Sequence, residues 1–210
     1  MRLKPYVVQE GFFPNPSQSA LKVQPMVRKA SKDFALKNGG KILNDFLTSF
    51  VPWDDCVVDS KLVMVKPGWY PAIPGWHLDA APRGEDGLPT LQANSLNSEH
   101  IALNIGVEVP TMYLLEELDL PEKSQNSKEE GPIYKIWDRH IKNIDGLDVA
   151  LSYAGDVIRF DGKSLHRCSE SRVSGWRMFI RASRNTGRLP ANEMRTQVQV
   201  YMNGLDKAGW

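Results

Sequence analysis

Three residues of this chain, His77, Asp79 and His166, have the types and spacing of a metal site. His77 and Asp79 flank one leucine in the stretch PGWHLD (74–79). Side chains at positions i and i+2 of an extended strand point to the same side, so an imidazole and a carboxylate can converge there on one point. His166, in the stretch GDVIRFDGKSLHR (155–167), supplies a second imidazole. Two histidines and one carboxylate form a facial triad, which binds a metal ion and leaves other coordination positions open.

Two arginines further along the chain point to an anionic ligand. Arg177 and Arg181 share one face of a predicted strand at 176–183. The other face is apolar and is expected to pack against a helix; it consists of Trp176, Met178, Ile180 and Ala182. Both guanidinium groups then face the interior or the mouth of the fold, where a cation is costly unless an anion pairs with it. No acidic residue nearby in the sequence is an obvious partner, and a carboxylate ligand would meet the need.

The elements that position these residues are predicted from hydrophobic periodicity and turn residues. Helical spacing predicts helices over 31–51, with a break at Gly39-Gly40, and over 133–144. Strands are predicted at 56–65, 101–109, 156–160, 164–168, 176–183 and 195–202. Short strands between Gly and Pro turns, with helices mostly before or inserted, predict a mainly β fold with flanking α-helices, either a β-sandwich or a jelly roll.

The predicted strand 101–109, with the sequence IALNIGVEV, alternates strictly. One face is apolar and consists of Ile101, Leu103, Ile105, Val107 and Val109. Asn104 lies on the opposite face, where its amide is available to a polar ligand.

Length and composition indicate one domain. The 210 residues, 41% of them hydrophobic, are enough to bury a sizeable core. We expect a single domain over 1–210, with an N-terminal helical segment at about 1–51 packed on the core and a C-terminal extension at about 185–210. The chain has two cysteines and no stretch typical of a signal sequence or a membrane span. We therefore expect a soluble, cytoplasmic protein with buried, reduced thiols and no membrane partner.

Charge is unevenly distributed along the chain, although the net charge is only +1. Residues 1–41 hold eight basic and two acidic residues, and residues 163–210 hold nine and three. Residues 42–162 hold nine basic and twenty acidic residues. Faces that are solvated or that neutralise one another in the fold explain such a pattern. Contact with a nucleic acid or an acidic protein is the alternative.

The motifs PGWHLD, GDVIRFDGKSLHR and GWR, in this order and spacing, resemble the Fe(II)/2-oxoglutarate-dependent dioxygenase superfamily over roughly residues 60–184. The resemblance implies a double-stranded β-helix, which is a jelly roll. It implies that His77, Asp79 and His166 bind Fe(II) and that Arg177 grips the distal carboxylate of the cosubstrate 2-oxoglutarate. Asn104 is a candidate for a further cosubstrate contact. The segment 121–144 is an insertion that the family pattern does not assign.

The implied activity is an oxidation with O₂ in which 2-oxoglutarate is converted to succinate and CO₂. Asp79 favours hydroxylation of a C–H bond, or oxidative demethylation, because halogenating members of the superfamily typically lack this carboxylate. Candidate substrate contacts are Arg181, Trp76, Tyr70 and Arg83. The polar segment 82–98 is a candidate lid at the mouth of the pocket. His100 and His140 are not expected to be ligands.

The substrate class stays open at this stage. A small molecule, a peptide side chain and a nucleobase all fit an approach rich in aromatic residues. The alternative function is a cupin-like module that binds a metal or a small molecule without oxidising anything.

Overall fold

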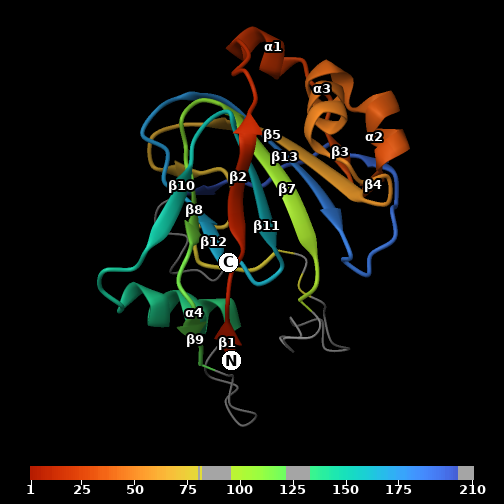
Figure 1. Cartoon of the computed structure of the whole chain (residues 1–210). Coiled ribbons are helices and arrows are strands. Elements are labelled where there is room, and N and C mark those ends of the chain that lie inside the picture. Colours follow the sequence, from red (N-terminus) through yellow and green to blue (C-terminus); the bar gives the residue numbers. More distant parts are fainter. Residues whose placement is uncertain (80, 82–95, 122–132, 203–210) are drawn as a thin grey trace.

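The protein has a mainly β architecture with four helices and fifteen strands in the residues that its computed structural model describes, 1–79, 81, 96–121 and 133–202 (Figure 1). The helices are α1 (Gln18–Lys22), α2 (Lys32–Asn38), α3 (Gly40–Phe50) and α4 (Ile133–Lys142). The strands are β1 (Arg2–Leu3), β2 (Val7–Phe12), β3 (Val27–Arg28), β4 (Ala30–Ser31), β5 (Val57–Val65), β6 (Trp69–Tyr70), β7 (Glu99–Gly106), β8 (Thr111–Leu114), β9 (Leu118–Asp119), β10 (Val149–Ser152), β11 (Asp156–Asp161), β12 (His166–Cys168), β13 (Gly175–Arg184), β14 (Glu193–Met194) and β15 (Tyr201–Met202).

Two antiparallel sheets form the centre of the molecule. The large sheet has six strands in the order β2-β11-β7-β13-β5-β4, and the small sheet has three in the order β10-β8-β12. An isolated antiparallel bridge between His77 and His166 adds one further chain segment beside β12. The remaining described strands pair in twos, among them β15 with β6. The two larger sheets lie opposite each other in Figure 1.

The outer face of the large sheet packs against the N-terminal helices. The hydrophobic core joins Met178, Ile180 and Ala182 of β13 to buried residues of α3, including Leu43 and Phe46. The predicted helical cover of the apolar face of β13 is therefore confirmed. The predicted break is confirmed as well, because α2 ends at Asn38 and α3 begins at Gly40.

The inner face of the large sheet meets the small sheet. Ala102 of β7 and Phe160 of β11 form a buried cluster with Tyr113 of β8. Helix α4 packs on the other side of the small sheet, in a cluster that joins Trp137 to Leu114. The space between the two sheets is thus lined by alternate residues of β5, β13, β8 and β12.

Three sequence predictions about elements need correction. Strand β7 ends at Gly106, whose φ of 106° turns the chain, so Val107 and Val109 pack with Val63 and Val65 and not with the β7 face. Only Tyr201–Met202 forms a strand within the predicted segment 195–202. The predicted N-terminal helical segment begins with strands, of which β2 is one of the two edge strands of the large sheet. An edge strand needs one apolar face at most, which is why its short, mostly exposed sequence gave no clear signal.

The two cysteines, Cys56 and Cys168, are free and buried, as the sequence predicts. None of the helices in the described part of the chain combines the length and the apolar character that crossing a membrane requires.

Candidate metal and anion site

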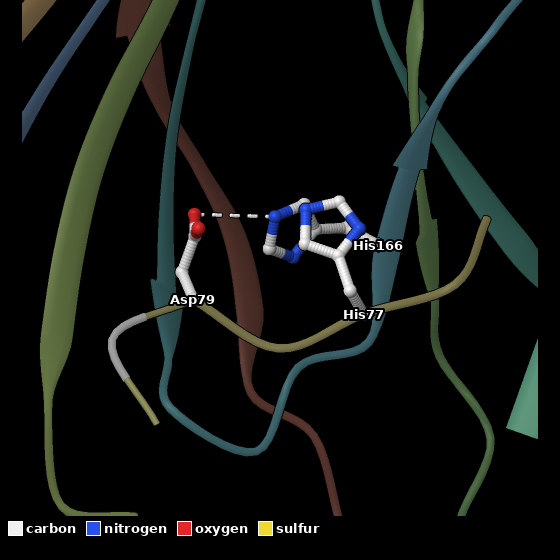
Figure 2. A group of neighbouring side chains, drawn as sticks. All are labelled: His77, Asp79 and His166. Atoms are coloured by element: carbon white, nitrogen blue, oxygen red, sulfur yellow. Dashed lines mark ion pairs between the residues drawn. The ribbon is translucent and has the colours of Figure 1, made fainter. Parts of the chain in front are cut away.

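His77, Asp79 and His166 converge at one end of the space between the sheets (Figure 2). One potential ligand atom of each lies within 4.8 Å of the others. The two histidines are brought together by their backbones, because each N–H donates to the carbonyl of the other at 3.1 Å. Their ring centroids are 4.5 Å apart, and Asp79 Oδ2 lies 3.2 Å from His166 Nε2. The convergence predicted from the sequence is therefore present.

Backbone carbonyls set the orientation of both imidazole rings. Nδ1 of His77 lies 2.9 Å from the carbonyl of Gly75, and Nδ1 of His166 lies 3.0 Å from that of Ser164. A carbonyl only accepts hydrogen bonds, so each Nδ1 carries a proton. Nε2 of His77 then keeps its lone pair, whereas Nε2 of His166 lies beside the Asp79 carboxylate. A histidine whose second nitrogen is held in this way is the usual form of a metal ligand.

The protonation states of His77 and Asp79 also suit a metal ligand. Burial, together with the neighbouring His166, lowers the pKa of His77 to about 4, so this ring is neutral at pH 7. Burial alone would raise the pKa of Asp79, but the guanidinium of Arg181 and the adjacent His166 hold it well below its usual range. A neutral imidazole and an ionised carboxylate are the protonation states that a divalent metal requires. The group can therefore hold a metal ion.

Arg181 is placed as the partner of a metal ligand. Its Nη1 forms an ion pair with Asp79 Oδ2, and its Nη2 lies 3.9 Å from Asp59 Oδ2. Asp59 is directly opposite Arg181 in the pairing of β5 with β13. Arg181 thus has two carboxylate partners inside the protein. A contact with substrate, as predicted from the sequence, stays a prediction.

A single pocket extends from this triad along the inner face of the large sheet. It is lined by Lys61, Pro71, Ala72, His77, Asp79, Thr111, Tyr113, Phe160, His166, Cys168, Arg177, Phe179 and Arg181. Arg177 and Arg181 are four residues apart on β13, which corresponds to about 13 Å along an extended strand. The two arginines therefore mark opposite ends of the pocket.

Arg177 is a buried cation without an acidic partner in the described part of the chain. Only 4% of its surface is exposed. Its Nε donates to the carbonyl of Val109 at 3.3 Å, and its Nη2 donates to Thr111 Oγ1 at 3.4 Å. Burial lowers the pKa of this guanidinium to about 10, because a charge is unfavourable away from water. An anionic ligand would remove this penalty.

Thr111 is a pocket residue that the sequence analysis missed. Its Oγ1 accepts hydrogen bonds from Asn104 Nδ2 at 3.1 Å and from Arg177. A hydroxyl that accepts two bonds still has its own proton to donate, and Thr111 lines the pocket. Asn104, predicted as a cosubstrate contact, is buried behind Thr111 and is not among the residues that line the pocket. No local pattern marks Thr111, because its position depends on the pairing of the small sheet.

Two other predicted site residues, Trp76 and Tyr70, lie outside the pocket lining. Trp76 is buried in the cluster around α4, and its backbone N–H donates to Asp138 Oδ1 at 3.1 Å. Tyr70 is half-buried and donates its hydroxyl proton to Glu170 Oε2 at 3.1 Å. Arg83 and most of the predicted lid, residues 82–95, lie outside the described residues, as do residues 122–132 of the insertion.

Neither of the two other histidines joins the metal-binding group. His100 is buried between two serines, with Nε2 3.0 Å from Ser98 Oγ and Nδ1 2.8 Å from Ser183 Oγ. His140 is exposed on α4. Both placements agree with the sequence prediction.

No protein-family model, curated protein or solved structure matches this chain.

Proposed function

We propose that this chain is an Fe(II)- and 2-oxoglutarate-dependent dioxygenase with a jelly-roll fold. The reaction converts a substrate C–H bond, O₂ and 2-oxoglutarate into the hydroxylated product, succinate and CO₂, and hydroxylation next to nitrogen would give demethylation. The single observation that carries the proposal is the pocket itself. It has two histidines and a carboxylate at one end and an uncompensated buried guanidinium at the other.

The strand order supports the jelly-roll part of this proposal. The four central strands β11-β7-β13-β5 of the large sheet face β10-β8-β12 and the segment that pairs His77 with His166. Eight segments in two facing antiparallel sheets are typical of a jelly roll. In this arrangement the metal-binding group lies at one end of the small sheet, where β12 begins.

The residues present fit both groups that the proposal requires. Two imidazoles and one carboxylate are a donor set that would suit Fe(II) and would leave further coordination positions open. The guanidinium of Arg177 and the hydroxyl of Thr111 suit a carboxylate, which accepts from both. 2-Oxoglutarate combines such a distal carboxylate with a keto acid that can chelate a metal.

Several pocket residues then have definite tasks. Fe(II) and 2-oxoglutarate, when bound, supply the redox chemistry with O₂. Arg177 and Thr111 hold the distal carboxylate and so orient the keto acid toward the triad. Tyr113, Phe160 and Phe179 line the pocket with aromatic rings and limit the entry of water. Arg181 keeps the Asp79 carboxylate ionised and fixed in direction.

An anaerobic titration tests the proposal. Fe(II) and 2-oxoglutarate added together should give a visible charge-transfer band that neither gives alone, and exposure to O₂ should then release succinate. His166→Ala should give no band, and Arg177→Met should require more 2-oxoglutarate for the same band. Metal binding without the band and without succinate would refute the proposal and favour the cupin-like binding module.

A further inference from the structure

Lys61 is a second cation in the pocket that contains Arg177. It lies in the middle of β5, directly opposite Phe179 of β13. Residues that face each other across an antiparallel pair share one face of the sheet, so Lys61 points to the same side as Phe179 and Arg177. Lys61 and Arg177 are diagonal neighbours in this pairing, within reach of long side chains. Both line the pocket.

The Lys61 ammonium is held by neutral groups alone. It donates to the carbonyl of Pro71 at 2.6 Å and to the carbonyl of Gln199. An ammonium has three N–H donors, so one is left for a ligand. No carboxylate of the described residues forms an ion pair with Lys61. Burial, followed by the nearby charge of Arg177, lowers its pKa to about 8.

The charges on this inner face are distributed unequally along the pocket. Asp59 and Asp79 both lie at the Arg181 end, where they pair with Arg181. Asp59 also accepts from Arg195 Nη2 at 3.0 Å. The Arg177 end has two cations and, among the described residues, no carboxylate paired with either. A cationic pair that the protein does not neutralise indicates a binding site for an anion.

The C-terminal extension holds Lys61 in this position. Arg195 Nε donates to the carbonyl of Ser60 at 3.0 Å, next to Lys61 in the chain. Val200 packs against Val63, Val65 and Val109, and β15 pairs with β6. Between these two anchors lies Gln199, whose carbonyl accepts from Lys61. Without this acceptor the flexible lysine stem could turn its ammonium toward solvent.

We propose that Lys61 and Arg177 together form a two-cation cradle for the distal carboxylate of 2-oxoglutarate, and that residues 195–202 complete this cradle by fixing Lys61. The inference rests on the proposed function, because it names a further binding residue of that pocket. The inference goes beyond the proposed function because it makes the C-terminal extension a part of the cosubstrate site.

Calorimetry of Fe(II)-loaded protein without O₂ tests the cradle. Two probes are compared, 2-oxoglutarate and 2-oxovalerate, which has the same chain length but a methyl group in place of the distal carboxylate. Lys61→Met should weaken 2-oxoglutarate binding by about 10- to 100-fold, as expected for the loss of a contact to a charged group, and leave 2-oxovalerate binding nearly unchanged. The control is Lys66→Met, since Lys66 is exposed and stacks over Trp69 at 5.6 Å.

A double-mutant cycle tests the role of the extension. Val200→Asp places a charge in an apolar contact and should loosen residues 195–202 from β5, which weakens 2-oxoglutarate binding. Combined with Lys61→Met it should weaken binding little further, because both changes remove the same ammonium. If the two substitutions weaken 2-oxoglutarate binding by fully additive free energies, residues 195–202 do not act through Lys61 and this part of the inference is wrong.

The outcomes separate this inference from the proposed function. If the unmodified protein binds 2-oxovalerate as tightly as 2-oxoglutarate, the proposed cosubstrate is wrong. If Arg177→Met removes the preference for 2-oxoglutarate while Lys61→Met behaves like Lys66→Met, the cosubstrate assignment holds and the cradle is wrong.

Discussion

Replacing Arg177 with methionine should weaken cosubstrate binding without destabilising the free protein. Replacing a residue that serves the fold lowers the free energy of unfolding. A residue that is kept for ligand binding often destabilises the free protein, so replacing it does not lower the free energy of unfolding. Arg177 is suited to this distinction, because it is buried, charged and without a carboxylate partner among the described residues. Methionine retains much of its apolar stem.

The magnitude follows from the surroundings of the guanidinium. Burial lowers the pKa of Arg177 from its ordinary range to about 10, which corresponds to about 3 kcal/mol against the charged form. Its two hydrogen bonds are long, at 3.3 and 3.4 Å, and together stabilise the folded protein by about 1–2 kcal/mol. The free energy of unfolding of Arg177→Met should therefore equal or exceed that of the unmodified protein. Loss of a buried contact between charges should cost about 2–4 kcal/mol in 2-oxoglutarate binding, or about 30- to 1000-fold in affinity.

Two measurements on the same variant decide the matter. Chemical denaturation gives the free energy of unfolding, and calorimetry gives the affinity for 2-oxoglutarate. Arg181→Met is the matched comparison, since it leaves the Asp79 carboxylate without the guanidinium that pairs with it and should destabilise the protein by roughly 2–4 kcal/mol. Destabilisation of Arg177→Met by a similar amount, with unchanged affinity, would show that Arg177 is a structural residue and refute the reasoning.

Three further predictions concern the triad and the pH dependence. His166→Ala should lower Fe(II) affinity by at least about 100-fold, measured by anaerobic titration, and retained affinity would reject the triad. Burial lowers the pKa of His100 to about 3, so below pH 6.5 the unfolded state binds a proton at this residue that the folded state does not. The free energy of unfolding should therefore fall as the pH falls, and His100 should account for a decrease of about 2 kcal/mol at pH 5. Chemical denaturation at pH 7 and pH 5 should show a smaller difference in the free energy of unfolding for His100→Gln than for the unmodified protein. An equal difference would contradict the role of His100 in this pH dependence. Lys61, which faces Arg177, Cys168 and Arg195, has a pKa of about 8, and a bound anion favours its charged form. Affinity for 2-oxoglutarate should therefore decline as the pH rises above about 8 in the unmodified protein, and Lys61→Met should lack this decline.

The parts of the site that the sequence predicts are those fixed by local geometry. His77 and Asp79 are two residues apart, so their convergence follows from the period of an extended chain. The alternation over 176–183 likewise assigns Arg177 to one face and Met178 to the other, and β13 has this arrangement. Helical spacing with a glycine pair gives α2 and α3 with the gap between them.

The parts that could not be predicted depend on which strands become neighbours. Lys61 and Thr111 reach Arg177 only through the pairing of β5 with β13 and the approach of the small sheet. Asp59 is opposite Arg181 for the same reason, although 122 positions of sequence separate them by their numbers. The end of β7 was missed because Gly106 interrupts the strand in the backbone while the apolar alternation continues past it.

The uneven charge along the sequence can now be explained in part by ion pairs inside the fold. Arg181, Arg184 and Arg195 come from the basic C-terminal region, and their partners Asp79, Glu99 and Asp59 come from the acidic middle region. Such pairing favours mutual neutralisation over contact with a nucleic acid as the origin of the pattern. Arg177 belongs to the same basic region but pairs with no carboxylate of the described residues. Its place in the pocket, beside Lys61, means that the missing negative charge is most simply supplied by a ligand.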